Sequence, residues 1–378
     1  MFVPTLRRAI KMNTTCSPFS RAVISAMRKL YPEHLADKSW DNTGLLLEAP
    51  FNPQRRQKNS VLLAVDLTKA VVDEAIERKD SIIVAYHPII FRGLKAITLN
   101  DSQQTSLLRL AAEGISVYSP HTAFDAAPGG LGDWLADIIT GTARGGPNDE
   151  EPSEVKDETA ETEESDPFVD GKRPTYMLQH HPSQRKIKDA DLSLGAAAHT
   201  RSVIKPSNLP DIPDAGMGRI VRFNQPQQLS TIIHRIARGV GNPKGFPIAI
   251  PQGKSVKDIT IRSAAICAGS GGSLFSGLDD IDLLFTGELA HHDALAAIER
   301  GQCVITLFHS NTERGFLHTV LRNQLMNKVK EEWTAVRREG KEMLHTPKEF
   351  MDILDDESVS IETSERDRDP YGLIIATE

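Results

Sequence analysis

The sequence predicts an α/β protein made of two related three-layer α/β lobes with mainly parallel sheets, joined by an acidic disordered insertion. Short runs rich in Val, Ile and Leu alternate with amphipathic segments, which is the pattern of β-α-β units whose sheet is covered on both faces. The same alternation recurs beyond a polar, acidic tract. The length of 378 residues also fits two domains, at roughly 100 to 200 residues each.

The first lobe is expected over residues 16–141, after an N-terminal extension of residues 1–15. Apolar spacing with a polar opposite face predicts its helices, and short apolar runs predict its strands. The lobe opens with a helix at 17–32. Strands follow at 61–67, 81–88 and 115–125, with helices at 68–79 and 101–114 between them.

The acidic insertion spans residues 142–173, which are too polar to recover the entropy of ordering, so we expect them to be disordered. The second lobe is expected over 174–378, and its C-terminal segment is expected to pack back on the first lobe. Its predicted elements are a strand, turn and helix over 218–241, strands at 246–251, 257–269, 281–287 and 302–309, and helices at 291–301 and 312–333.

Charge and composition exclude several classes of protein. The net charge is −7, but residues 149–170 alone carry −10, which leaves the remainder slightly basic at +3 and permits an anionic substrate. The sequence has no basic stripe of the kind that binds nucleic acid, and no apolar run near the roughly 18 residues of a membrane span. Three scattered cysteines exclude a disulfide scaffold and indicate a reducing compartment.

The first 32 residues carry six basic residues and no acidic one. A short basic amphipathic helix at the start would be typical of a mitochondrial presequence. The alternative is a slightly extended N-terminus before the first helix, with Met12 as a second start. We expect a cytoplasmic protein, with mitochondrial import as the open alternative.

Three predicted strands end in residues that bind metal ions. His87 follows the strand at 81–88, His121 and Asp125 end the strand at 115–125, and His309 and Glu313 follow the strand at 302–309. Functional residues gather beyond the carboxyl ends of parallel strands, because the loops there converge on one crevice. Imidazole suits Zn, Fe, Ni or Co, and carboxylates can bridge two cations. One His/Glu pair alone would suit a helix start, but three such strand ends together favour a metal site.

A fourth strand end carries Glu288 and the adjacent pair His291 and His292. Neighbouring residues on a helix point about 100° apart, so both histidines are not expected to bind one ion. We expect at least one of the two histidines to orient substrate, to shuttle a proton or to hydrogen-bond a metal ligand. In a hydrolase, Glu288, His291 or His292 could move protons, with His121 in support. The alternative for the histidine pair is a solvent-facing helix start.

The sequence resembles the Nif-three-like family, also labelled GTP cyclohydrolase I type 2 homologue. The motifs run in order from Trp40 to Pro370: SWDNTGLLLE, AYHPIIFRGLKAIT, YSPHTAFDAAPGGLGDWLA, CAGSGGSLF, TGELAHHDAL, FHSNTERGFL and SERDRDP. The resemblance implies a dinuclear metal site between two α/β lobes. It also implies a toroidal homohexamer, a trimer of dimers whose sites face an internal cavity.

Carried over by motif, the metal ligands are His87, Asp125, His309 and Glu313. They would hold two divalent ions per subunit, of Zn, Fe, Mn, Ni or Co. Bacterial members typically have His-His-Pro where this chain has Tyr86-His87-Pro88. A phenol with an ordinary pKa near 10 is a poor ligand at neutral pH, which puts the second metal position in question.

The leading functional hypothesis is a metal-dependent hydrolase acting on a nucleotide, a pterin or another phosphorylated metabolite, as the family label suggests. The rival is a non-enzymatic, ring-shaped scaffold or metal-handling factor that interacts with transcription or other regulatory proteins. The acidic insertion could dock a basic partner in the second case, or be a solvated loop with no partner.

Overall fold

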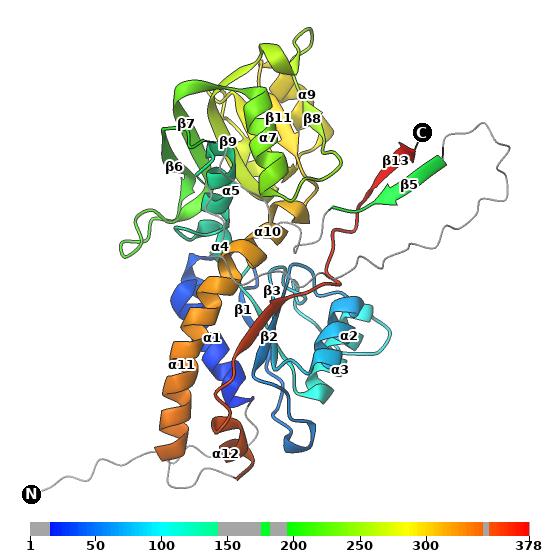
Figure 1. The fold of residues 1–378 in the computed structure, drawn as a ribbon, viewed down its shortest axis with the longest axis vertical. Coiled ribbons are helices and arrows are strands. Elements are labelled where there is room, and N and C mark those ends of the chain that lie inside the picture. The colour runs from blue at the N-terminus through cyan, green and yellow to red at the C-terminus, as the bar shows by residue number, and fades with distance from the viewer. Residues whose placement is uncertain (1–15, 143–174, 182–194, 343–347, 378) are drawn as a thin grey trace, which may run out of the picture.

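A computed structural model describes residues 16–142, 175–181, 195–342 and 348–377 (Figure 1). The predicted N-terminal extension lies outside the described residues, and so does the predicted acidic insertion apart from Thr142. The described chain forms two β-sheets, each flanked by helices, and a separate two-stranded ribbon.

The first sheet has five strands in the order β1-β4-β3-β2-β12. Its strands are β1 (Gly44–Leu47), β2 (Ser60–Ala64), β3 (Ile82–Ala85), β4 (Ser116–Ser119) and β12 (Ser360–Thr363). Only the β1–β4 pair is antiparallel, so this sheet is mainly parallel, as predicted. β12 comes from the C-terminal part of the chain and pairs with β2.

Helices cover both faces of the first sheet. α2 (Lys69–Arg78) and α3 (Ser102–Glu113) pack on one face, and α1 (Pro18–Leu30) and α11 (Arg322–Glu342) on the other. Local sequence sets several of these ends. The side chains of Thr68 and Asp101 cap the starts of α2 and α3, and Gly114 ends α3 in a left-handed conformation.

The second sheet has six strands in the order β6-β7-β9-β10-β11-β8. They are β6 (His199–Pro206), β7 (Gly216–Gln228), β8 (Ile248–Ala249), β9 (Thr260–Ser270), β10 (Leu283–Glu288) and β11 (Cys303–Thr306). Only β9–β10 and β10–β11 are parallel, so the prediction of a mainly parallel sheet is wrong here. The reason is that a short loop joins β6 to β7, and a parallel pair needs a long crossover.

Helices also cover both faces of the second sheet. α5 (Leu131–Thr140) and α7 (Leu229–Gly239) pack on one face, and α8 (Gly272–Phe275) and α9 (His291–Glu299) on the other. α5 therefore packs on the second sheet although it precedes the acidic tract, and α11 packs on the first sheet although it follows β11.

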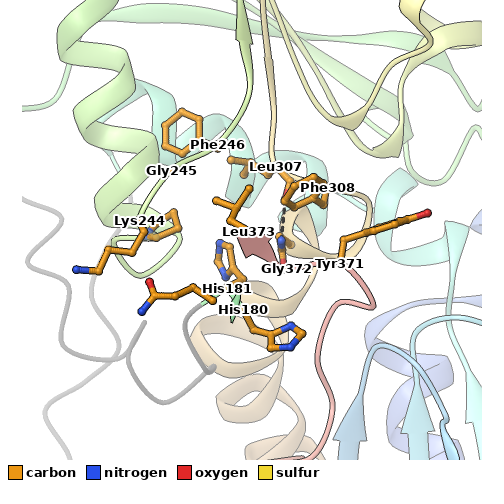
Figure 2. A pocket seen from close by; sticks show the side chains of 13 residues that line it. His180, His181, Lys244, Gly245, Phe246, Leu307, Phe308, Tyr371, Gly372 and Leu373 are labelled. Carbon is orange, nitrogen blue, oxygen red and sulfur yellow. Dashed lines mark hydrogen bonds between the residues drawn. The ribbon is translucent and has the colours of Figure 1, made fainter. Parts of the chain in front are cut away.

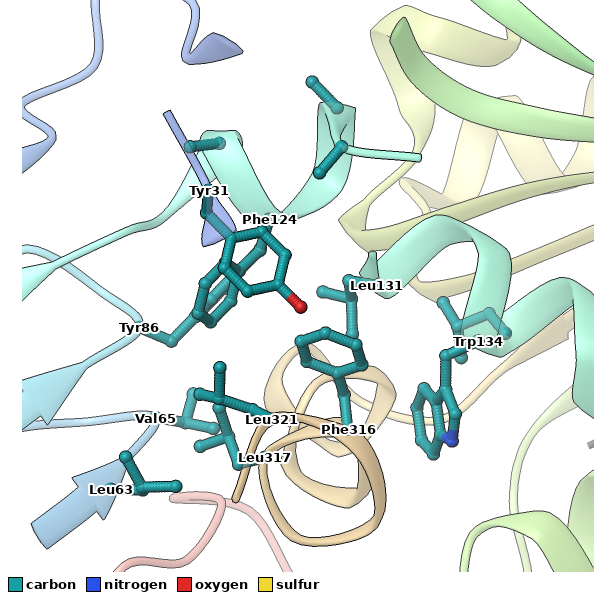
Figure 3. Close-up of a cluster of buried hydrophobic side chains, with 14 of the residues drawn as sticks. Tyr31, Leu63, Val65, Tyr86, Phe124, Leu131, Trp134, Phe316, Leu317 and Leu321 are labelled. Carbon is teal, nitrogen blue, oxygen red and sulfur yellow. The ribbon is translucent and has the colours of Figure 1, made fainter. Parts of the chain in front are cut away.

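One continuous hydrophobic core joins the two halves of the molecule (Figure 3). Tyr31, Phe124 and Phe316 lie at its centre, and their rings pack at centroid distances of 4.4 to 6.4 Å. The helix predicted at 312–333 is present as one continuous helical run from Arg314 to Glu342. It consists of α10 (Arg314–Phe316), a π-helical turn at Leu317–Leu321, and then α11.

The remaining elements are short. α4 (Thr122–Ala126) follows β4, and α12 (Lys348–Leu354) follows α11. β5 (Thr175–Gln179) and β13 (Leu373–Thr377) form an antiparallel ribbon that stands apart from both sheets (Figure 1). Single 3-10 turns lie at Glu33–Leu35, Pro53–Arg55, Val256–Asp258 and Ser310–Thr312. No helix in the described ranges is both long and apolar enough to cross a membrane.

Candidate metal centre

Three predicted ligands meet where the two sheets face each other. His87 follows β3 of the first sheet, whereas His309 and Glu313 follow β11 of the second. Their ligand atoms all lie within 4.8 Å of one another. The Nε2 atoms of His87 and His309 are 3.5 and 3.7 Å from the two carboxylate oxygens of Glu313. Two imidazoles and a carboxylate are a donor set that suits a divalent transition metal.

The surroundings of Glu313 fit such an ion. Its side chain is 2% exposed, and its Oε2 atom has no hydrogen-bond partner among the described residues. A buried, unpartnered carboxylate oxygen is costly, so its presence indicates a missing positive partner. Gly269 borders the group, and a Cβ atom there would lie 2.9 Å from His309 Nε2 and 3.0 Å from Glu313 Oε1. The absence of a side chain at Gly269 keeps this space open.

The raised pKa values of two buried carboxyl groups also fit a bound cation. Burial, and then the nearby charges of Asp125 and Asp66, raise the pKa of Glu313 well above its usual range. Burial also raises the pKa of Asp125. The site thus collects acidic groups that repel one another's ionisation, and a bound cation would relieve this repulsion.

Each histidine of the group is fixed by a second carboxylate. Asp66 Oδ1 lies 2.9 Å from His87 Nδ1, and Glu288 Oε1 lies 3.0 Å from His309 Nδ1. Metal-binding histidines usually hydrogen-bond through the nitrogen that does not face the ion, which sets the tautomer. Glu288 therefore reaches the group only through His309, and its own side chain is exposed.

Asp125 lies beside the three-residue group but is not part of it. The hydroxyl of Tyr86 donates to Asp125 Oδ1 over 2.8 Å. Tyr86 itself is 2% exposed and packs against Phe124 in the core that Figure 3 shows. Burial raises the pKa of Tyr86 well above 10, so it remains a neutral phenol that satisfies one oxygen of Asp125.

A second pair, His121 and Asp41, lies next to the metal group. His121 Nδ1 is 2.6 Å from Asp41 Oδ1, and the His121 ring centroid is 5.6 Å from that of His87. Asp41 also accepts from the backbone N–H and the hydroxyl of Thr122. Burial opposes the ionisation of Asp41, but its hydrogen bond to His121 and the charge of His121 outweigh burial and lower its pKa to about 2.

His291 and His292 are placed differently. Both begin α9 as exposed residues, and their rings contact each other at a centroid distance of 5.3 Å. Neither belongs to the three-residue metal group. Their proposed role in proton transfer stays a prediction.

Several residues of this region were not identified from the sequence. Asp66 follows β2, so the strand-end rule that selected His87 could have selected it too. Asp41 lies in the SWDNTG turn, and Arg314 lies directly after Glu313. Arg314 donates to Asp66 Oδ2 over 3.0 Å and is almost fully buried. Its burial, which sequence spacing does not reveal, distinguishes it from a surface arginine.

Backbone strain occurs at two positions of the site. Among the described residues, five other than glycine have positive φ, and two of these are His121, at 34°, and Phe308, at 64°. Phe308 directly precedes His309. Such strain costs about 1 to 3 kcal/mol per residue and clusters at functional sites, where the surrounding structure enforces it.

A small pocket lies beside the ribbon and shares Phe308 with the surroundings of the metal group (Figure 2). It is lined by residues that include His180, Phe308 and Tyr371, and none of the predicted site residues is among them. Its volume is about 20 Å³, which is enough for a single water molecule. The pocket contains none of the grouped ligands, and the metal group remains the candidate site because of its own donor set.

Comparison with known proteins identifies the family of this chain. The sequence model of the family described as Duf34/NIF3 (NGG1p interacting factor 3) matches residues 20–339. The NIF3 homolog of Schizosaccharomyces pombe is 41% identical over 319 residues, which cover 83% of this chain and 93% of the relative. NGG1-interacting factor 3 of Saccharomyces cerevisiae is 33% identical over 311 residues, which cover 81% and 90%.

The fold has solved counterparts as well. A crystal structure of a Bacillus cereus protein related to NIF3 aligns with a TM-score of 0.56 and 19% identity. The alignment covers 96% of this chain and 99% of the bacterial one, so the two share a fold. Together with the family match and the yeast relatives, this places the chain: it belongs to the Duf34/NIF3 family.

Proposed function

We propose that this protein is a metal-dependent hydrolase whose ion is held by His87, His309 and Glu313. The observation that carries the proposal is the buried Glu313 carboxylate, which lies between two imidazoles with one oxygen unpartnered. When bound, a divalent ion supplies a Lewis acid that makes water a nucleophile near neutral pH.

The chain's own residues then orient and move protons. Asp66 and Glu288 hold the Nδ1 atoms of the two histidines, which leaves both Nε2 atoms directed at Glu313. The Asp41–His121 pair has the arrangement of a general base with its orienting carboxylate. Because His121 lies against the His87 ring, it is the residue best placed to exchange a proton with water or substrate.

The substrate class that we propose is a planar metabolite with an anionic group, such as a nucleotide or pterin phosphate. Trp40 is half-exposed, and its ring lies 5.6 Å from His121 and 6.0 Å from Phe91. Its open face could stack on a flat ring. Arg92, which follows Phe91, is exposed and supplies a positive charge.

We further propose that only the first of the two expected metal positions is complete in this chain. A second ion would need Asp125, and one oxygen of Asp125 already accepts the Tyr86 hydroxyl. A buried phenol with a raised pKa does not replace a histidine ligand at neutral pH. The second position would therefore bind weakly or stay empty.

Metal analysis of the purified protein tests the site. We expect a stoichiometric divalent transition metal in the wild type and its loss in Glu313→Gln. Glu332→Gln is a matched control, because Glu332 lies on α11 and pairs with Lys29 far from the histidines. If the wild type contains no such metal, or if Glu313→Gln keeps the full amount, the assignment is wrong.

A substrate panel tests the activity. Metal-loaded protein would be incubated with nucleotides, including GTP, and with other phosphorylated metabolites, and release of phosphate or formate would be measured. We expect at least one substrate whose hydrolysis is lost in both Glu313→Gln and His121→Ala. Metal-loaded protein that turns over nothing in the panel would favour the second candidate function.

That second candidate is a partner-binding factor that assembles as a homohexamer, a trimer of dimers, and handles a metal without catalysis. It is supported by the name of the budding yeast relative, NGG1-interacting factor 3. Deletion of residues 145–172 separates the two functions. A hydrolase is expected to keep its activity without this segment, whereas a partner bound by the acidic tract is expected to be lost from a pull-down. Light scattering after size exclusion measures the oligomer.

A further inference from the structure

The segment at residues 364–371, between β12 and β13, runs past the carboxyl end of β2. Figure 1 shows this red segment crossing from the first sheet toward the ribbon. It contains the SERDRDP motif and lies outside the part of the chain that the family model matches. The backbone N–H of Ser364 donates to Leu63 O over 2.8 Å, so the segment enters as a continuation of the β12–β2 pair.

The start of the segment is anchored away from the metal group. Glu74 of α2 is buried and accepts from the hydroxyl of Ser364 and from the backbone N–H groups of Glu365 and Arg366. Three hydrogen bonds to one buried carboxylate fix this turn of the chain. The two aspartates that follow, Asp367 and Asp369, then have defined positions.

Asp367 acts on the His87 side. Its carboxylate accepts from the backbone N–H groups of Val65, over 2.6 Å, and Asp66, over 3.3 Å. It also pairs with Arg314 at 2.5 Å, and both side chains are almost fully buried. Arg314 in turn donates to Asp66, which holds His87 Nδ1. Asp367 thus fixes the backbone at Asp66 and also Arg314, which is the positively charged partner of Asp66. Asp66 is the carboxylate that orients His87.

Asp369 acts on the His309 side. It is 2% exposed, and its Oδ2 atom accepts from the backbone N–H of Ser310 over 3.1 Å and from its hydroxyl over 2.5 Å. Its Oδ1 atom accepts from the backbone N–H of Tyr371. Ser310 directly follows His309, and its hydroxyl oxygen also accepts from Arg314. Asp369 therefore fixes the turn that carries His309 and leads to Glu313.

We propose that Asp367 and Asp369 are positioning residues for the metal group, so that the C-terminal segment completes a site whose ligands lie on other elements. This inference rests on the proposed metal function. Residues that orient metal ligands typically contribute about 10- to 100-fold to metal affinity. A residue needed only for stability would lower the unfolding temperature without changing the metal affinity of the folded protein.

The test measures the metal affinity of full-length protein by competition between Zn²⁺ and a chelator, at a temperature where circular dichroism shows the fold intact. We expect Asp369→Asn to weaken Zn²⁺ binding by about 10- to 100-fold, because an amide offers one acceptor oxygen where the carboxylate served Ser310 and Tyr371. The imidazole NMR signals of His309 are expected to shift in the metal-free variant. Glu77→Gln is the control, since Glu77 only pairs with Arg366 at the surface of the same segment.

Ser310→Ala is a second variant, in case Asp369→Asn fails to fold. It removes the hydroxyl that joins Asp369 to Arg314 but keeps the backbone hydrogen bond, so a smaller loss of several-fold is expected. Wild-type affinity in the folded Asp369→Asn and Ser310→Ala variants would overturn the inference. Failure of the wild type to bind Zn²⁺ would instead overturn the proposed metal function, so the two failures are distinguishable.

Discussion

Gly269 offers the sharpest test of the metal centre, because substituting it changes the space for an ion without replacing a ligand. It lies near the end of β9 with φ at +59°, and its backbone is held on both sides. Its N–H donates to Thr312 Oγ1 over 2.9 Å, and its carbonyl accepts from Thr286 Oγ1 over 3.0 Å. An added Cβ atom therefore could not move away from the ligands.

The size of the effect follows from these contacts. The new Cβ would lie 2.9 Å from His309 Nε2 and 3.0 Å from Glu313 Oε1, whereas ordinary contacts begin near 3.4 Å. The two ligand atoms would have to move by about half an ångström, and metal sites tolerate only about 0.2 Å. We expect Gly269→Ala to lose about 100-fold in metal affinity or more. The left-handed backbone adds a cost of about 1 to 2 kcal/mol to the free energy of unfolding.

Gly277→Ala separates the two costs. Gly277 has φ at +80° and no atom within 4 Å of an added Cβ, so it carries the backbone cost alone. Chemical denaturation of the metal-free proteins measures stability, and chelator competition measures metal affinity. Both variants are expected to be destabilised, but only Gly269→Ala should lose the metal. Wild-type affinity in Gly269→Ala, or an equal loss in both variants, would refute the reasoning.

Three further predictions concern the surrounding residues. Tyr86→His is expected to raise the number of divalent ions per chain, because it supplies an imidazole beside Asp125; an unchanged ratio by elemental analysis would contradict this. The lowered pKa of Asp41 stabilises the fold by about 1 to 2 kcal/mol above about pH 4. This stabilisation is lost as the pH falls to about 2. The free energies of urea unfolding of Asp41→Asn and of the wild type should therefore converge near pH 2. Trp40 is half-exposed, whereas Trp134 and Trp333 are buried. GTP should therefore quench the tryptophan fluorescence of the wild type but not that of Trp40→Phe. Equal quenching in both proteins would exclude stacking on Trp40.

The sequence allowed the family, three strands of the first sheet (β2, β3 and β4) and the three grouped ligands to be predicted, because each depends on local order along the chain. Apolar runs and strand-end residues are visible in sequence, and they located His87, His309 and Glu313 correctly at strand ends. The strand-end rule, however, assumes that all of these strands belong to one sheet. The structure brings His87 from the first sheet to His309 and Glu313 of the second, and the common core that places them together has no local signature.

The second sheet and the supporting residues could not be predicted in the same way. β6 and β7 are antiparallel because only residues 207–215 join them, which are too few for the crossover that a parallel pair needs, and apolar content does not reveal this. Asp367 looks like an ordinary surface acid in sequence. It becomes part of the site only because β12 returns to pair with β2, which is a contact between residues about 300 positions apart.

The charge balance explains why a cation is favoured over a packing role for Glu313. Arg314 is the buried cation nearest to it in sequence, but the guanidinium already pairs with Asp66 and Asp367 and lowers the pKa of Glu313 only in part. With Asp125 nearby, a metal-free Glu313 is pushed toward its protonated form, and its Oε2 atom still has no hydrogen-bond partner among the described residues. A purely structural role would be served better by a neutral or apolar side chain, since unpaired buried carboxylates destabilise a fold. The proposed divalent ion between the two histidines would satisfy the carboxylate, the imidazoles and the surplus negative charge together.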